Sequence, residues 1–458
     1  MTHPTSTAET AEHALDLLRR HATGDFLDLV LDLGSSTGCV LADARTGRRY
    51  LDMTGFFASA PLGCNHPGLN GAAGDFAAEL LTAARHKPSN PDFGTVFQAR
   101  FVEAFLRVLG DDEMPYLFFI DGGALAVENA LKVAFDWKTR WNASQGHAVA
   151  GWRVLHLEHA FHGRSGYTMS LTNTDPAKTW AYPAFDWPRI PSPAVADDAL
   201  WEQPGLLPHE QAALEAAEVA FRRYPHEVAC VVAEPIQCEG GDRHLRPQFL
   251  QGLQDLAHRH DALFVLDEVQ TGCGATGRAW AYQALDLAPD LVAFGKKTQV
   301  CGVMGGRKVL EIPDNAFRSV SRISSTWGGN LVDMVRATRI LEVIEEDGLL
   351  AAAAASGALL LDGLRDCAAR YPEILSAPRG RGLLCAVDVV NGMARDRILE
   401  IAQQRHHALF LGCGDRTLRL RPPLSVTREE IEDAVTRLGE AVAEVVREGV
   451  GLEAESRT

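Results

Sequence analysis

The chain has 458 residues, of which 46% are hydrophobic and 23% charged, the composition of a globular protein large enough for two or three domains. Its formal net charge is −16 at pH 7, and its lysines and arginines form no basic cluster along the sequence. Binding to a nucleic-acid backbone requires such a cluster, so nucleic acid is excluded as an expected partner.

The sequence also argues against a membrane, a secretion route and a metal. Its first twelve residues are polar and lack the apolar core of a secretion signal. The longest apolar run, at 349–361, is interrupted by a serine and is too short to span a bilayer, so we expect a buried helix there. Nine cysteines are scattered without a CxxC pair, which favours neither a zinc site nor a disulfide framework. We therefore expect a cytoplasmic protein with no bound metal and no membrane partner.

The first 340 residues change character near residue 65. An amphipathic helix is expected at 13–21, followed by strands between residues 27 and 53. From about 65 to 340, helices alternate with short apolar strands, the pattern of a parallel sheet covered on both faces. The expected strands are 116–120, 152–158, 228–234, 262–269 and 291–295. A helix precedes the fourth of them, with apolar residues at positions 249, 250, 253, 256 and 257.

Two later segments depart from this alternation. Five prolines between residues 186 and 208 predict an ordered loop or surface insertion. After residue 340, long helices at 341–370 and 428–447 surround strand-like segments at 383–390 and 417–424. We therefore predict three parts, which are an N-terminal segment (1–64) joining a small α+β domain, a large domain (65–340), and the C-terminal part of the small domain (341–458).

Lys296 and Asp267 carry the chemical prediction. Each follows or closes an apolar strand, at the sheet edge where open α/β folds bind ligands. Pyridoxal phosphate chemistry needs an amine that forms a Schiff base with the aldehyde and a carboxylate that keeps the ring nitrogen protonated. Lys297 is the competing amine, and alternation along a strand would turn the two lysine side chains to opposite faces.

Two further strand ends carry residues that suit such a ligand. Gly122, Gly123 and Ala124 precede a helix, where small residues let backbone N–H groups approach a phosphate. Taken alone, they are better explained as an ordinary turn. Phe161 and Arg164 could stack on a ring and hold a carboxylate, although a core phenylalanine and a surface arginine are equally consistent with the sequence.

Two other patterns are weaker. Glu234 and Glu239 could form an acid–base pair after a strand, but surface acids are the better interpretation of each alone. The segment 272–277 matches GxGxxG, yet the residues DEVQ separate its glycines from the strand, so no dinucleotide is expected there.

Together these residues resemble the class III aminotransferases, the ω-aminotransferase group of fold-type I pyridoxal phosphate enzymes. The resemblance covers about residues 25–445, and its most specific segments are LDEVQTGCGATGRAWAYQALDLAPDLVAFGKK, STWGGN and RLRPPL. It implies an α/β fold with a large domain, built on a mainly parallel seven-stranded sheet covered by helices, and a small α+β domain from both termini. It also implies pyridoxal 5′-phosphate as the cofactor.

The resemblance assigns residues to that cofactor. Lys296 would hold its aldehyde, and Asp267 would pair with its pyridinium nitrogen. Most members carry a hydroxyl residue in the phosphate loop, which this chain lacks at Asp121-Gly122-Gly123-Ala124. The phosphate would therefore be held mainly by the N–H groups of Gly123 and Ala124.

Further roles follow from the same resemblance. Phe161 and Val269 would pack on the two faces of the ring, and Gln270 would lie near its phenolic oxygen and the substrate. Thr326 would reach the phosphate of a neighbouring subunit's cofactor, which implies a homodimer with active sites at the interface.

The same resemblance predicts the substrates. The segments GGALAVENALKVAFDWK, AFHGRSGYT and GKKTQVCGVMGG are most similar to those members that take the ε-amino group of L-lysine and pass it to 2-oxoglutarate. Arg164 and Arg419 would clamp substrate carboxylates, and Glu239 would neutralise Arg419. The alternatives left open are an ornithine, 4-aminobutyrate or diamine donor, a related decarboxylase or aminomutase, and a non-enzymatic regulator.

Overall fold

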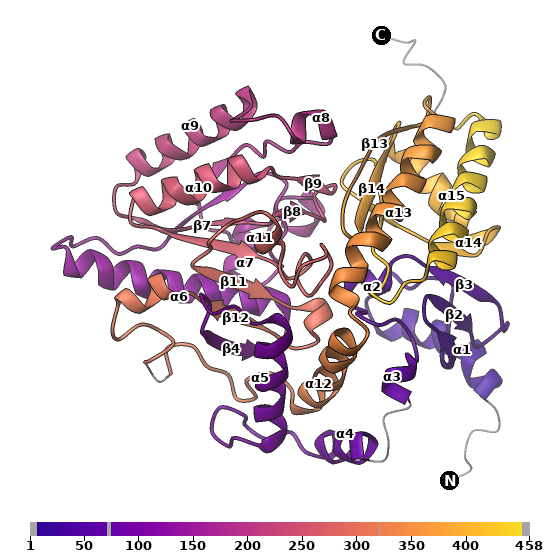
Figure 1. Ribbon diagram of the computed structural model, residues 1–458, viewed down its shortest axis with the longest axis horizontal. Helices are drawn as coiled ribbons and strands as arrows, with labels where there is room; N and C mark the ends of the chain where they lie inside the picture. Colours follow the sequence, from indigo (N-terminus) through magenta and orange to yellow (C-terminus); the bar gives the residue numbers. More distant parts are fainter. Residues whose placement is uncertain (1–6, 71–74, 320, 451–458) are drawn as a thin grey trace.

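The computed structural model describes residues 7–70, 75–319 and 321–450 (Figure 1). Its largest sheet has seven strands in the order β4-β12-β11-β10-β7-β5-β6. Only β12 runs antiparallel to its neighbours, so the predicted mainly parallel seven-stranded sheet is confirmed. The strands are β4 (Tyr116–Ile120), β5 (Arg153–Leu157), β6 (Arg189–Ile190), β7 (Val228–Ala233), β10 (Leu263–Asp267), β11 (Leu291–Phe294) and β12 (Cys301–Gly305).

Helices cover both faces of this sheet, because its central strands are apolar on both sides. In β7, Val231 belongs to one buried cluster and Cys230 and Val232 to another, as the two-residue period of a strand requires. Helix α6 (Gly123–Ser144) packs against one face. Helices α9 (Pro208–Arg223) and α10 (Pro247–Arg259) lie together on the other, as Figure 1 shows.

The prediction for α10 is confirmed in detail. The five apolar positions that suggested a helical face are its buried residues, Phe249, Leu250, Leu253, Leu256 and Ala257. Their spacing places them on one side of the helix, toward the sheet.

There are two smaller four-stranded sheets, and one of them combines both ends of the chain. One contains β1 (Leu31–Thr37), β2 (Val40–Asp43), β3 (Arg49–Asp52) and β15 (Ala408–Leu409). The other contains β13 (Leu375–Arg381), β14 (Leu384–Val389), β17 (Thr417–Leu420) and β16 (Leu411–Cys413). Strand β15 pairs in parallel with β3, which ties the N-terminal segment to the C-terminal part. The domain boundaries at residues 65 and 341 stay predictions.

The remaining elements connect these sheets or cover them. They are α1 (Thr7–His21), α2 (Gly55–Ala58), α3 (Pro67–Asn70), α4 (Asp75–Arg85), α5 (Val96–Leu109), α7 (Gly166–Leu171), α8 (Asp198–Trp201), α11 (Ala281–Ala284), α14 (Gly392–Gln404), α15 (Arg428–Glu448), the hairpin strands β8 (Ile236–Gln237) and β9 (Arg243–His244), and the 3-10 turns η1 (Pro176–Lys178), η2 (Lys296–Thr298) and η3 (Arg307–Glu311).

The prediction of a single helix at 341–370 was wrong. It is two helices, α12 (Leu331–Glu346) and α13 (Leu349–Arg370), which are bent by 69° at their junction. Gly348 at the break adopts the left-handed conformation (φ 62°) that glycine tolerates best. No single helix among the described residues is long and apolar enough to cross a membrane, although the bent α12–α13 pair meets the length and composition requirement together.

The expectation of a loop or insertion at 186–208 was also wrong in part. Residues Arg189–Ile190 form β6, which pairs in parallel with β5 and is the edge of the large sheet. The segment also contains α8. Proline is tolerated at an edge strand, because one side of such a strand donates no ladder hydrogen bonds.

Candidate functional site

A cavity of about 430 Å³ opens at the carboxyl ends of the parallel strands of the large sheet. The strand ends that line it carry the residues that the sequence singled out, since parallel strands end at one edge. Its lining residues are Gly123, Ala124, Phe161, His162, Gly163, Arg164, Glu234, Ile236, Asp267, Val269, Gln270, Thr271, Lys296 and Cys301. Three predicted site residues, Glu239, Thr326 and Arg419, are not among them.

Lys296 lies in this cavity because the chain turns sharply after β11. It begins the 3-10 turn η2 and adopts a left-handed backbone (φ 52°), which is unusual for a residue with a side chain. Burial lowers the pKa of the Lys296 amine. Lys297 points elsewhere and donates a hydrogen bond of 2.9 Å to the carbonyl oxygen of Ala58. The two lysines therefore separate as expected, but a 3-10 turn separates them rather than strand alternation.

Asp267 ends β10 and is held by two hydrogen bonds. Its Oδ1 accepts the N–H of Val269 at 3.0 Å, and its Oδ2 lies 2.8 Å from Nδ1 of His162. His162 is fully buried, and sequence reasoning did not single it out. With Asp267 as a carboxylate, Nδ1 of His162 is the donor, and this contact orients the carboxylate oxygens. The signal in the sequence for a role of His162 was its position between Phe161 and Arg164, two residues predicted to lie in the site.

The turn before α6 forms a cradle for an anion. Gly122 precedes the helix with φ 100°, and in the described part of the chain no side chain caps the first N–H groups. A Cβ atom on Gly123 would lie 2.8 Å from a Cγ atom of Val269, so only glycine leaves this approach open. The uncapped N–H groups and the helix dipole favour a phosphate at this end.

The cavity walls fit the expected cofactor. Phe161 and Val269 both line it, and Gln270 follows Val269 at its rim. Lys296, the buried carboxylate of Asp267 and the N-terminus of α6 face the same space. An amine for an aldehyde, a carboxylate for a ring nitrogen and N–H groups for a phosphate are the donor set that pyridoxal phosphate requires.

Glu234 is not the surface acid that the sequence favoured. It is 6% exposed, lines the cavity, and accepts the N–H of Phe161 at 2.9 Å. Burial raises the pKa of Glu234 well above its ordinary value, and the nearby charge of Asp267 raises it further. The raised pKa favours the neutral form of Glu234, which limits the negative charge beside Asp267.

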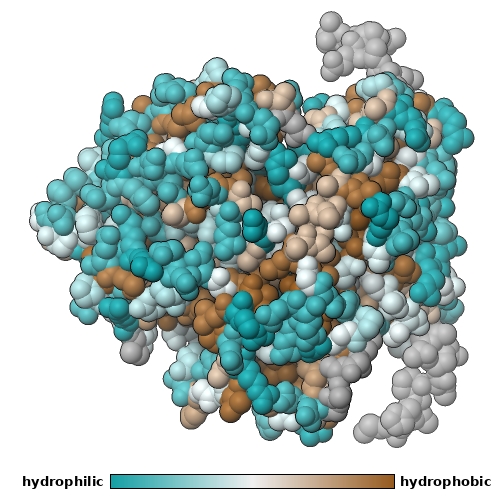
Figure 2. Space-filling model, viewed as in Figure 1, coloured by the Kyte–Doolittle hydropathy of each residue, from teal (hydrophilic) through white to brown (hydrophobic). Residues whose placement is uncertain are grey.

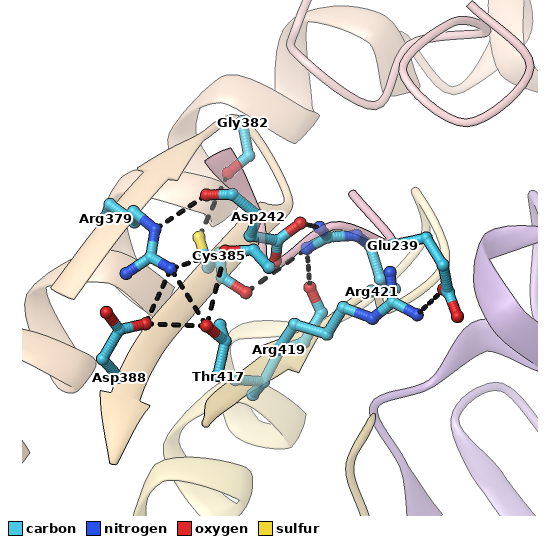
Figure 3. A network of polar contacts seen from close by, with 11 residues as sticks. Glu239, Asp242, Arg379, Gly382, Cys385, Asp388, Thr417, Arg419 and Arg421 are labelled. Carbon is cyan, nitrogen blue, oxygen red and sulfur yellow. Dashed lines mark hydrogen bonds and ion pairs between the residues drawn. The ribbon is translucent and has the colours of Figure 1, made fainter. Parts of the chain in front are cut away.

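Arg419 and Glu239 meet beside the cavity (Figure 3). Arg419 lies on β17 with a side chain that is 2% exposed, and its Nη2 donates to Oε2 of Glu239 at 2.6 Å. Its Nε and Nη1 have no hydrogen-bond partner among the described residues. Burial acts to raise the pKa of Glu239, but the charges of Arg419 and Lys178 outweigh it and lower that pKa to about 2. The pair is therefore ionic, and its guanidinium retains free donors for a second anion.

The remaining predicted residues occupy less enclosed positions. Arg164 lines the cavity but is exposed, with its guanidinium carbon 6.0 Å from the centre of the Phe161 ring. Thr326 is exposed in the segment before α12 and lies outside its own chain's cavity. Among the described residues no group of three or more His, Cys, Asp or Glu side chains is placed to hold a metal ion.

Comparison with known proteins identifies the family of this chain. The family model for aminotransferase class-III matches residues 25–442. L-lysine-epsilon aminotransferase from Amycolatopsis lactamdurans is 57% identical over 426 residues, 93% of this chain and 94% of that protein. The enzyme of the same name from Streptomyces clavuligerus is 54% identical, over 94% of this chain and 95% of its own. The solved structure of lysine aminotransferase from M. tuberculosis in the internal aldimine form superimposes with a TM-score of 0.91 at 52% identity, covering 95% of this chain and 99% of that one.

The raised pKa of Glu234 predicts a pH-dependent stability. The folded protein binds this proton more tightly than the unfolded chain, so the stabilisation is complete below about pH 4.5 and is lost as the pH rises toward the raised pKa. Glu234→Gln keeps the acceptor for Phe161 and carries no charge. Its melting temperature should exceed that of the unchanged protein by about 2–4 °C at pH 8.5 and by much less at pH 5. Thermal melts of the cofactor-free proteins measure this, with exposed Glu311→Gln as the control. An equal difference at both pH values would contradict it.

Proposed function

The chain belongs to the class III aminotransferases, and from that premise we propose that it transfers the ε-amino group of L-lysine to 2-oxoglutarate. The products are L-glutamate and 2-aminoadipate 6-semialdehyde, which cyclises to a piperideine carboxylate. The observation that carries the proposal is the buried Arg419, which is neutralised by Glu239 yet has two nitrogens, Nε and Nη1, without a partner among the described residues. The choice of lysine is supported by the relatives of that name at 54–57% identity.

Aminotransferases of this class use pyridoxal 5′-phosphate, which supplies an aldehyde for the amino group and a ring that withdraws electrons from the breaking bond. Gly123 and Ala124 would hold its phosphate with their N–H groups. Asp267 would hold the proton on the ring nitrogen, with His162 fixing the carboxylate. The Lys296 amine would take a proton from the ε-carbon of lysine, and burial favours the neutral amine that a base must be.

The two substrates place different demands on one cavity. The reacting carbon of lysine is a CH₂ group, whereas the reacting carbon of 2-oxoglutarate is bonded to a carboxylate. A free Arg419 beside the lysine chain would be an unpaired buried charge, which is costly. We infer that Glu239 pairs with Arg419 while lysine is bound and leaves it for the carboxylate of 2-oxoglutarate. The exposed Arg164 holds the far carboxylate of either substrate.

We also propose a homodimer in which Thr326 contacts the phosphate of the partner's cofactor. Thr326 is exposed and outside its own chain's cavity, so it is available to a second subunit. Large apolar side chains are exposed in α4, in α5 and in the segment between them. Leu81 is 52% exposed, Phe93 is 69% exposed and Val96 is 66% exposed. Figure 2 shows hydrophobic residues gathered over α5 and α12 on one face of the molecule. Exposed apolar area of this kind marks a surface that a partner covers.

A cytoplasmic location remains part of the proposal. All nine cysteines are free, and eight of them are buried. Buried, unpaired thiols suit a reducing compartment, where disulfides do not form.

The direct test is the product formed from L-lysine and 2-oxoglutarate by the purified holoenzyme. We expect glutamate and the cyclic piperideine in equal amounts, identified by mass spectrometry. Ornithine, 4-aminobutyrate and putrescine serve as comparison donors. A kcat/KM for any of them that exceeds the value for lysine would overturn the proposed donor.

The two adjacent lysines provide a matched pair of variants. Lys296→Ala should lose the covalent link to the cofactor, seen as loss of the yellow absorbance, together with essentially all turnover. Lys297→Met keeps an apolar stem in its buried position against Ala58, so it should retain both. Retained turnover in Lys296→Ala would exclude Lys296 as the anchoring base.

The proposed movement of Glu239 on and off Arg419 predicts opposite effects of substitutions in the two half-reactions. Arg419→Ala should slow reaction with 2-oxoglutarate while sparing reaction with lysine, because only the former places a carboxylate there. Glu239→Ala should show the reverse bias, since it leaves Arg419 unneutralised beside lysine. Losing one such clamp costs about 2–5 kcal/mol in binding. Stopped-flow absorbance measures each half-reaction separately, and equal losses in both would leave Glu239 with a structural role only.

A further inference from the structure

The carboxylate of Glu239 contacts a second cation besides Arg419. Its Oε1 lies 3.0 Å from Nζ of Lys178, while its Oε2 accepts from Arg419 at 2.6 Å. The two cations differ in exposure, since the side chain of Lys178 is 16% exposed and that of Arg419 is 2% exposed. Glu239 is therefore a bridge between an enclosed guanidinium and a more accessible ammonium.

A second cavity lies on the Lys178 side of this bridge. It has a volume of about 320 Å³ and is lined by Lys178, Glu239, Thr174, Arg395 and Gly414, among others. Glu239 lines this cavity and not the one that contains Lys296. The carboxylate thus borders open space that it shares with Lys178.

Lys178 is held independently of Glu239. Its Nζ lies 3.3 Å from Oγ1 of Thr174 and 5.3 Å from the centre of the Phe161 ring. The other cation of the cavity, Arg395, is already engaged with Asp396 at 2.8 Å and with the carbonyl oxygen of Gly414 at 3.0 Å. Among the described cations that line this cavity, Lys178 is thus the one in contact with Glu239.

We propose that Lys178 is a positioning residue that holds Glu239 in this second cavity when 2-oxoglutarate takes its place on Arg419. The inference rests on the proposed function, in which Glu239 must leave Arg419 for one substrate and return for the other. A displaced carboxylate without a counter-ion would be an unpaired charge in a half-buried place, which opposes the exchange. Lys178 removes that penalty because it contacts Glu239 before and after the movement.

The role predicts an asymmetric effect. Without Lys178, Glu239 remains paired while it sits on Arg419, but it has no partner once displaced. Ligands that require the displaced state should therefore bind more weakly, and ligands that require the paired state should be unaffected. Losing a hydrogen bond to a charged group in this partly buried position predicts a weakening of about tenfold.

The test compares two unreactive ligands on the holoenzyme. Glutarate carries the second carboxylate that requires Arg419, and hexanoate has the chain length of lysine with one carboxylate. Calorimetry should show that Lys178→Met weakens glutarate about tenfold and changes hexanoate less than twofold. Lys178→Arg should restore glutarate binding. Lys308→Met is the matched control, because Lys308 is also half-buried over an aromatic ring, that of Trp137 at 5.8 Å.

A double-mutant cycle makes the assignment specific. In a Glu239→Gln background, Lys178→Met should have no further effect on glutarate, because no charge then needs to be held. The same loss in both backgrounds, or equal weakening of both ligands, would overturn the inference. Lys178→Gln, which keeps a polar contact with Thr174, replaces Lys178→Met if the latter does not fold.

Kinetics separate this inference from the proposed function. The holoenzyme loaded with pyridoxamine phosphate and mixed with 2-oxoglutarate should react about tenfold less efficiently in Lys178→Met, with the loss in KM rather than in kcat. If the unchanged enzyme fails with lysine, the proposed donor is wrong, and the acceptor and glutarate comparisons still decide the role of Lys178. If lysine reacts and the asymmetry is absent, only the role of Lys178 is overturned.

Discussion

The site depends on how the loop of the β8–β9 hairpin is fastened to the C-terminal sheet. Residues 239–242 lie between β8 and β9, and Asp242 forms a fully buried ion pair with Arg421 (Figure 3). Arg379 adds hydrogen bonds of 2.8 Å to the carbonyl oxygens of Gly241 and Asp242. Breaking a buried pair by removing one partner costs about 3–5 kcal/mol, since the other charge is left uncompensated. This attachment fixes the position of Glu239, and so of the charge beside the substrate.

Strand alternation explains why one short segment makes these contacts. In TLRLR (417–421), every second residue points toward the loop, and the two leucines between them join the apolar core. Thr417, Arg419 and Arg421 contact Gly241, Glu239 and Asp242 respectively. One face of the segment 417–421 therefore holds the loop and presents the substrate clamp. A shift of one residue in this strand would bury both arginines in the core and expose the leucines to the loop.

Sequence alone predicts the parts of this protein whose information is local. The central strands were placed correctly because they are apolar runs bounded by polar residues. Asp267 ends β10, and Lys296 follows β11 after Gly295. Strands β6 and β12 were not predicted, because one has two residues and the other is the glycine-containing segment CGVMG. The contacts of His162 with Asp267 and of Lys178 with Glu239 join residues 105 and 61 positions apart, and no spacing rule indicates them. Glu234 was misjudged for the same reason, since its burial depends on neighbours distant in sequence.

The arrangement of charges limits what the site can accept. Arg419 and Lys178 carry two positive charges against the one negative charge of Glu239, so the group has an excess of one. A second substrate carboxylate balances that excess, whereas lysine, which brings no carboxylate to this end, leaves it in place. While lysine is bound, the pairing of Glu239 with Arg419 leaves the excess on Lys178, which is the more exposed of the two cations. Solvent reduces the cost of a charge at that position far more than at Arg419. The bridge therefore allows one cavity to bind substrates of different charge without leaving an enclosed charge unpaired.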